Sequence, residues 1–430
     1  MRKWVGMVAG IALLVGAMAT PAVASTPTGV LDTSFHSSGE VAIGSAWTTS
    51  ALAPAPNNGL YLALQSNTSR NEPVHVARLT SAGRPDPTFG SGGHTDVSLG
   101  IGDYNASYEL VPDGAGLLVV INDVNRSFGL VRLTANGKID TTFGSGGRVV
   151  FTYASGQYSE TIQTAHVLAD GLIELVLQRL AFPERDTPQS GGLDLVRLRA
   201  NGSPDSTLAP YGIKNLVNWS GQAEGERPQA AFTSDGKVYL ALPYSAGRSI
   251  LERRTTSGVF DPTFHSNGVR PYACPDWQHI PSGPILRVDA LGRPLLFCTL
   301  TAVENPVQND VFVARLTTAG AADNTFGSDG HFRAWLHYDG DIDDNMYGTD
   351  ATDRVVFAYL TDQGAPTHLH LARFTSAGIA DSTFGTSGAS TVTFSPRYRI
   401  SAGLAFGPNR IYASMYDVDP LSEIAIAVRS

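Results

Sequence analysis

One short acidic run in this chain of 430 residues has the residue types that bind a metal ion. Asp339, Asp341 and Asp343 alternate along it and are followed directly by Asp344. Hard cations such as calcium prefer clusters of carboxylate oxygens, so the run suggests a calcium site. Asp344 stands where an EF-hand loop needs glycine, and a solvated acidic loop is the competing interpretation. Calcium is the only cofactor that the sequence suggests.

Large aromatic residues recur at similar places and could stack against sugar rings or peptide side chains. They are expected near the ends of strands or in the loops that follow: Trp47, Trp219, Trp277, Trp335 and Tyr153. An indole ring offers an apolar face and an N–H donor, which suits a binding surface. We predict that these residues gather on one face of the fold and bind a ligand there. Packing over the edges of the fold is the structural alternative.

Motifs of the common catalytic chemistries do not occur in the sequence. It contains no His-Glu-x-x-His zinc motif, no Gly-x-Ser-x-Gly nucleophile elbow and no Walker loop. His368 and His370 would share one side of a strand, but no third zinc ligand follows nearby. Two carboxylates from distant parts of the chain could still cleave a polysaccharide. A hydrolase or lyase that uses loop acids is therefore the alternative function, with Asp103, Glu184 and Asp341 as its candidate residues.

A repeated phrase predicts the elements that must position these residues. Seven aspartates each have Ser or Thr two residues on and Gly seven on: Asp32, Asp86, Asp140, Asp205, Asp261, Asp323 and Asp381. Arginines lie eight residues before the last six, and a seventh stands next to the C-terminus: Arg78, Arg132, Arg197, Arg253, Arg315, Arg373 and Arg429. A buried Arg that faces the Asp of its own turn would satisfy both charges. Because the phrase recurs in every unit, it indicates architecture rather than one active site.

The units, which start near these aspartates, each contain four short β-rich runs. In the unit that starts at Asp140 the runs are Arg148 to Tyr153, Thr164 to Leu168, Leu172 to Gln178 and Leu193 to Leu198. The pattern predicts an all-β protein, a seven-bladed β-propeller of four-stranded antiparallel blades. An open β-solenoid is the alternative. The unpaired Asp32 and Arg429 favour a closed ring, in which the run Glu40 to Ile43 completes the last blade beside Ile424 to Val428.

The phrase resembles the hallmark of the delta-60 repeat family, the DUF5122-type β-propeller repeats of secreted bacterial proteins. Residues 132–144 fit its pattern Arg-Leu-x-x-x-Gly-x-x-Asp-x-Thr-Phe-Gly. The resemblance covers essentially the whole chain after the N-terminal segment. It departs at Leu208, where Phe is usual, and at Arg254, where Leu is usual. The resemblance implies a propeller and specifies no reaction or ligand.

The N-terminal segment predicts export. Arg2 and Lys3 precede an apolar run, and Ala22-Val23-Ala24 offers a signal-peptidase site. We expect a cleaved signal peptide at residues 1–24 and a single propeller domain at residues 25–430. The run is shorter than the about 20 residues that span a bilayer, so no membrane span is expected. The mature protein would then be secreted, periplasmic or held at the cell surface.

The net charge excludes one class of partner, and the cysteine content bears on disulfide formation. Residues 25–430 hold 28 Lys and Arg against 39 Asp and Glu, and this net charge of −11 repels phosphate backbones, so nucleic acid is not expected as a partner. Cys274 and Cys298 are the only cysteines. Either a disulfide or two separately buried thiols would fit.

The loops indicate where a ligand would bind. Because the predicted strands alternate in direction, the repeated phrase and the tight hairpins share one face, and the loops of variable length share the other. Binding residues are commonly carried on variable loops of a rigid scaffold. We therefore expect a secreted binding or scaffold module whose partner is a glycan or an extracellular protein, without catalysis.

Overall fold

The computed structural model places most of the chain after the N-terminal segment. It describes residues 28–67, 72–100, 106–123, 127–152, 158–181, 189–222, 228–245, 248–275, 284–301, 309–336, 346–361, 367–394, 398–418 and 421–430. Within these ranges, no helix has the length and apolar character needed to cross a bilayer. Statements about the structure below refer to these residues.

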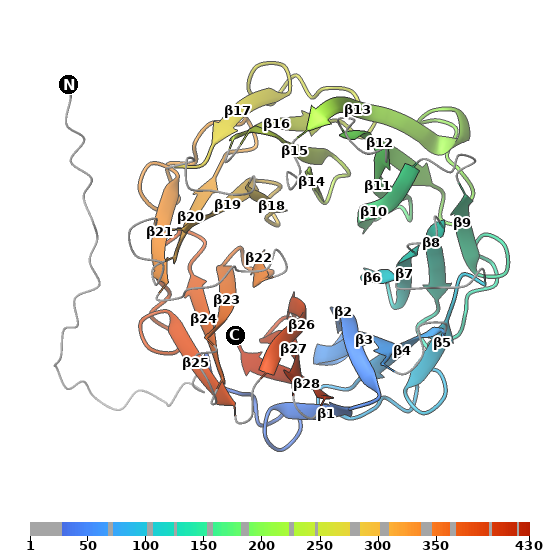
Figure 1. The fold of residues 1–430 in the computed structure, drawn as a ribbon, viewed down its shortest axis with the longest axis vertical. Helices are drawn as coiled ribbons and strands as arrows, with labels where there is room; N and C mark the ends of the chain where they lie inside the picture. The colour runs from blue at the N-terminus through green and yellow to red at the C-terminus, as the bar shows by residue number, and fades with distance from the viewer. Residues whose placement is uncertain are drawn as a thin grey trace.

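Seven four-stranded antiparallel sheets form a ring of blades (Figure 1). The first four blades, each given from its innermost strand outward, are β2 (Trp47–Ala55), β3 (Gly59–Ser66), β4 (Val74–Leu79), β5 (His94–Val97); β6 (Ser107–Asp113), β7 (Gly116–Asp123), β8 (Ser127–Leu133), β9 (Arg148–Thr152); β10 (Tyr158–Val167), β11 (Ile173–Ala181), β12 (Gln189–Leu198), β13 (Ile213–Gln222); and β14 (Gln229–Phe232), β15 (Val238–Ser245), β16 (Arg248–Arg254), β17 (Val269–Ala273). The predicted seven-bladed propeller is confirmed.

The remaining three blades have the same order. They are β18 (Ile285–Val288), β19 (Pro294–Thr301), β20 (Asn309–Arg315), β21 (His331–Leu336); β22 (Tyr347–Thr349), β23 (Val355–Thr361), β24 (Thr367–Phe374), β25 (Ala389–Phe394); and β26 (Tyr398–Phe406), β27 (Arg410–Val418), β28 (Leu421–Arg429), β1 (Glu40–Gly44). The 3-10 turns η1 (Pro56–Asn58) and η2 (Pro210–Gly212) join strands.

The N-terminal strand closes the ring. Strand β1 pairs antiparallel with β28, with Glu40 opposite Ile426 and Ala42 opposite Ile424. The outer edge of the seventh blade is therefore built from the start of the chain and the other three strands from its end. Pairing both ends into one sheet leaves the ring without an open gap between its first and last blades.

Apolar side chains fill the wedges between neighbouring blades. Strands such as β3 and β7 are continuous runs of buried residues, as expected where both faces of a sheet are covered. The phenylalanine of the repeated phrase is fully buried in six units: Phe35, Phe89, Phe143, Phe264, Phe326 and Phe384. Burial of each of these large aromatic side chains stabilises the folded protein.

The repeated Arg-Asp pair connects one blade to the next. Arg78 donates from Nε to Asp86 Oδ2 at 2.9 Å and from Nη1 to the carbonyl of Ala135, in the next blade, at 2.6 Å. Asp86 also accepts from the backbone N–H and hydroxyl of Thr88. Although burial alone would raise the pKa of Asp86, these bonds and Arg78 lower it. The Nε-to-Asp distance is 2.8 to 3.0 Å for Arg253–Asp261, Arg315–Asp323 and Arg373–Asp381, and Arg132 reaches Asp140 at 2.8 Å.

The fourth unit departs from this arrangement, as its altered phrase suggested. Arg197 Nη2 donates to Glu174 Oε1 at 2.7 Å, while Arg197 Nη1 lies 3.9 Å from Asp205 Oδ2. Glu174 is fully buried on β11 directly opposite Arg197. The guanidinium therefore binds one oxygen of a buried carboxyl group of its own sheet in place of the usual Asp partner.

Candidate functional site

A central channel runs between the innermost strands of the blades. Its wider part has a volume of about 750 Å³ and is lined by residues of β6, β10, β14 and β18. A second part of about 430 Å³ is lined by β2, β6, β18, β22 and β26. Tyr108, Glu109, Arg287 and Val288 line both parts, so the two cavities are continuous. Figure 1 shows these strands around the centre of the ring.

Glu109, on β6, carries the one carboxylate among the described residues that line the channel. Burial raises its pKa to about 7, and a hydrogen bond from the backbone N–H of Ala165 opposes this shift. Glu109 is half-buried between the innermost strands, and removal of part of the water around its carboxyl disfavours the charged form. Near neutral pH this group can therefore either donate or accept a hydrogen bond.

Arg287 brings a positive charge into the same channel from β18. Its Nη1 donates to the carbonyl of Leu286 at 2.9 Å, and its Nε donates to the carbonyl of Tyr347 at 3.3 Å. The second bond spans from β18 to β22, the innermost strand of the next blade. These bonds hold the guanidinium at the channel wall, where its cavities meet.

Amide side chains fasten the channel wall. Gln163 Nε2 donates to Gln178 Oε1 at 2.7 Å and to the carbonyl of Pro228 at 3.0 Å. Asn122 exchanges two hydrogen bonds with the backbone of Ile162, at 3.0 and 2.7 Å. These amides link neighbouring blades, so their role is structural.

Hydroxyl and aromatic groups complete the wall of the wider part. Ser107, Thr161 and Thr164 lie in its lining, as does His166, which stacks on Phe232 with ring centroids 5.8 Å apart. Burial lowers the pKa of His166, while a hydrogen bond with the backbone of Ser234 acts in the opposite direction. The imidazole is therefore neutral near pH 7 and acts as a polar aromatic surface.

Two of the predicted tryptophans, Trp47 and Trp219, are not among the residues that line the channel. Trp47 begins β2 and packs between the seventh and first blades, with its ring centroid 4.0 Å from that of His75. Trp219 lies near the end of the outer strand β13, partly buried against a cluster that includes Leu193 and Leu216. Both rings are thus partly buried between blades, and their binding of a ligand stays a prediction.

Of the other predicted aromatic and acidic residues, Trp335 alone belongs to the described part of the chain. Trp335 lies on the outer strand β21, opposite Asp310. Trp277 and Tyr153, the acidic run Asp339, Asp341 and Asp343, and the candidate acids Asp103 and Glu184 lie outside the described residues. Calcium binding at the acidic run stays a prediction.

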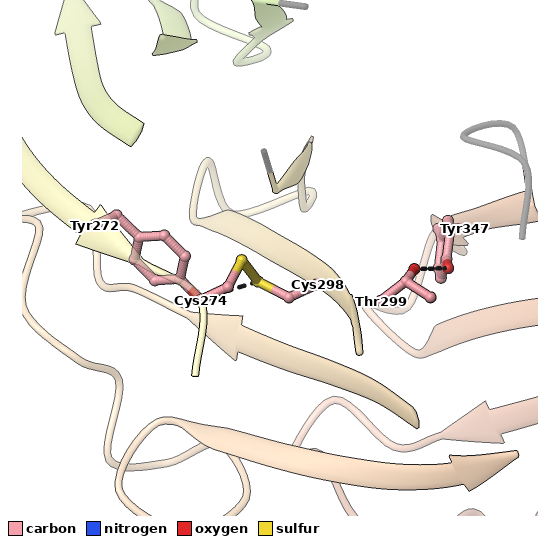
Figure 2. The surroundings of a disulfide bond; sticks show 5 residues. All are labelled: Tyr272, Cys274, Cys298, Thr299 and Tyr347. Atoms are coloured by element: carbon pink, nitrogen blue, oxygen red, sulfur yellow. Dashed lines mark hydrogen bonds between the residues drawn. A yellow bond between two sulfur atoms is a disulfide. The ribbon is translucent and has the colours of Figure 1, made fainter. Parts of the chain in front are cut away.

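Cys274 and Cys298 form a disulfide (Figure 2). Cys274 follows β17, and Cys298 lies on β19, so the bond joins the fourth and fifth blades although both cysteines belong to one repeat unit. The Tyr272 hydroxyl lies 3.8 Å from Cys298 Sγ. On the next residue, the Thr299 hydroxyl lies 2.9 Å from the Tyr347 hydroxyl of the sixth blade (Figure 2). Three blades are thereby linked in series.

Sequence analysis missed the two charged residues of the channel. Glu109 and Arg287 each interrupt a short apolar β-run, within Ser107–Asp113 and Ile285–Val288. A charged residue in a run expected to be innermost is the pattern that could have revealed them. The predicted site residues are instead aromatic and acidic residues near the loops.

Comparisons with known proteins agree with the fold. The family model described as "Domain of unknown function (DUF5122) beta-propeller" matches residues 115–143. No curated protein matches the chain in sequence.

Several solved structures are similar in shape. A puromycin hydrolase is 12% identical with a TM-score of 0.48, and the match covers 91% of this chain and 53% of that one. Prolyl oligopeptidase B from Galerina marginata is 11% identical with a TM-score of 0.43, covering 90% and 52%. Regucalcin from Agrobacterium tumefaciens, described as a calcium-binding protein, is 13% identical with a TM-score of 0.33, covering 94% and 92%.

These structures say nothing about the activity of this chain, because the identities and TM-scores are too low. The match also spans only about half the length of the first two. The segment match at residues 115–143 and the seven-bladed ring agree with the resemblance to DUF5122 β-propeller repeats.

Proposed function

We propose that the protein is an exported binding module for a glycan. The glycan is held at the variable-loop face of the ring and in the central channel, and it is not cleaved. The observation that carries this proposal is the composition of the channel wall. Among its described residues, hydroxyl groups, one arginine and the single carboxyl of Glu109 face the cavity. Such groups can form hydrogen bonds with the hydroxyl groups of a sugar.

The isolation of Glu109 favours binding over glycoside hydrolysis. Both hydrolytic mechanisms need two carboxyl groups, about 5 Å apart in retaining enzymes and about 6.5 to 9.5 Å apart in inverting ones. The described lining of the channel supplies one. A lone carboxyl with a pKa near 7 is a hydrogen-bonding group rather than half of a catalytic pair.

Loop variation supports the choice of face. The connections between strands on the variable-loop face run from residues 246–247, between β15 and β16, to residues 274–284, between β17 and β18. The opposite face repeats one phrase in every unit, and its Arg, Asp and Phe side chains hold the blades together. The length of the loops on the variable face thus differs from blade to blade, which suits a specific ligand.

The test is a binding screen of the purified chain against neutral and acidic oligosaccharides, followed by calorimetry on any that bind. We expect Glu109→Ala to weaken binding at least tenfold and the exposed control Glu72→Gln to leave it unchanged. Release of new reducing ends during incubation would instead support the hydrolase. Retention of an envelope protein with no glycan binding would show that the partner is a protein.

A further inference from the structure

Two histidines and one aspartate converge on the outer part of the first blade. His75 lies on β4, and His94 and Asp96 lie on the neighbouring strand β5. One ligand atom of each residue lies within 4.8 Å of the others, and this is the one such group of three among the described residues. His75 Nδ1 is 2.5 Å from Asp96 Oδ1.

Strand register explains why the three side chains meet. His75 stands directly opposite Asp96, and His94 stands opposite Ala77. Residues two apart on a strand point to the same side, so His94 and Asp96 share one face of β5 and His75 lies beside them on β4. The sheet itself therefore fixes the arrangement, without any loop.

The geometry points to a zinc site formed by His75, His94 and Asp96. Imidazole and carboxylate are zinc ligands, at about 2.0 to 2.2 Å from the metal, so two ligands of one tetrahedral ion lie about 3.4 Å apart. For the three ligand atoms to reach this value, the 2.5 Å between His75 Nδ1 and Asp96 Oδ1 must open, and any wider separation, which is at most 4.8 Å, must close. Water would take the fourth position, because His94 and Asp96 are exposed.

The surroundings of His75 hold its ring in place. Trp47 packs edge-on against it with ring centroids 4.0 Å apart, and the His94 centroid is 5.7 Å away. Trp47 and Ala77 also contact the apolar cluster between the seventh and first blades, where the ring closes. A bound ion would thus fasten β4 to β5 beside the closure of the ring.

A second histidine pair offers a matched control. His368 and His370 lie on β24 with ring centroids 6.1 Å apart. Both nitrogens of His370 are engaged, with the hydroxyls of Thr361 and Thr391, and His368 Nδ1 lies 2.9 Å from Thr393 Oγ1. Threonine hydroxyls thus surround this pair in place of a third ligand.

The experiment is calorimetric titration of the untagged, metal-free chain with zinc chloride. We expect one equivalent to bind, with affinity falling at least tenfold in His94→Ala and in Asp96→Asn and unchanged in His370→Ala. Circular dichroism confirms that each variant is folded. Equal binding by the wild type and the two site variants, or no binding to the wild type, would overturn the proposal.

A spectroscopic readout locates the ion. Cobalt in a tetrahedral site absorbs visible light, so the wild type should gain this absorption and His94→Ala should not. Cobalt should also quench the fluorescence of Trp47 through its contact with His75. Trp47→Phe should abolish that quenching while the calorimetric stoichiometry is retained; quenching that persists in this variant would place the ion elsewhere.

Discussion

Arg410 and Arg429 lie opposite each other on β27 and β28 and bind one carboxylate, that of Asp32. Arg410 Nε donates to Asp32 Oδ2 at 2.6 Å, and Arg429 Nε donates to Asp32 Oδ1 at 3.0 Å. Arg410 also donates to the carbonyl of Ser81 in the first blade, as Arg78 does to Ala135. The seventh clamp is therefore completed by Arg410, and Arg429, the arginine expected from the repeat, contacts the same Asp from a more exposed position.

The two arginines should differ in their effect on stability. Arg410 is 7% exposed and Arg429 is 25% exposed. Removing one partner of a buried ion pair costs about 3 to 5 kcal/mol, whereas a more exposed pair contributes about 1 kcal/mol or less. We expect Arg410→Met to lower the free energy of unfolding by the larger amount and Arg429→Met by the smaller. Urea unfolding measures both; equal losses would show that Arg429 contributes as much to the closure as Arg410.

The disulfide should stabilise the join between the fourth and fifth blades. The two cysteines are 24 residues apart, and a closed loop of this size reduces the entropy of the unfolded chain by an amount worth about 3 kcal/mol. We expect the double variant Cys274→Ser, Cys298→Ser to unfold at lower denaturant concentration by that free energy. Reductant should destabilise the wild type to the same extent and leave the double variant unaffected, which serves as the control.

Truncation of a phenylalanine between the blades should destabilise the fold far more than truncation of the leucine that replaces it in the fourth unit. Phe326 is fully buried beneath the Arg315 guanidinium, whose Cζ lies 4.3 Å from the ring centroid. Truncation of such a ring costs about 3 to 5 kcal/mol. Leu208 holds the equivalent place in the fourth unit and is only partly buried. Thermal unfolding should show a clearly larger loss for Phe326→Ala than for Leu208→Ala, and similar losses would contradict the packing role assigned to the ring.

The pH dependence of stability should report on Glu109. Burial raises its pKa to about 7 from an ordinary value of 4.5, so between these values the folded protein holds a proton that the unfolded chain has released. The associated stability is fully present below pH 4.5 and is lost as the pH rises through 7. Each unit of pKa displacement corresponds to about 1.4 kcal/mol.

Glu109→Gln removes this contribution and supplies the test. Between pH 5 and pH 8, the Tm of the wild type should fall relative to that of Glu109→Gln. The exposed control Glu72→Gln should follow the wild type. Parallel curves for the wild type and Glu109→Gln would mean that the carboxyl is fully hydrated in the channel.

The closed ring of seven blades could be predicted from the repeats alone. The spacing of the seven Asp phrases set the number of blades, and the unpaired Asp32 indicated that the chain ends meet; the pairing of β1 with β28 confirms this. Repeats reveal architecture because each unit must bury the same faces against its neighbours. The two cysteines left a disulfide and separate thiols equally open, since their distance depends on how adjacent blades pack.

Contacts between residues of different blades and strands could not be predicted in this way. Glu109 and Arg287 are 178 positions apart and line one channel because every blade directs its first strand toward the axis. His75, His94 and Asp96 meet through strand register, and Arg410 reaches Asp32 across 378 positions. Such contacts depend on closure of the ring and on pairing between strands, which local residue patterns do not encode.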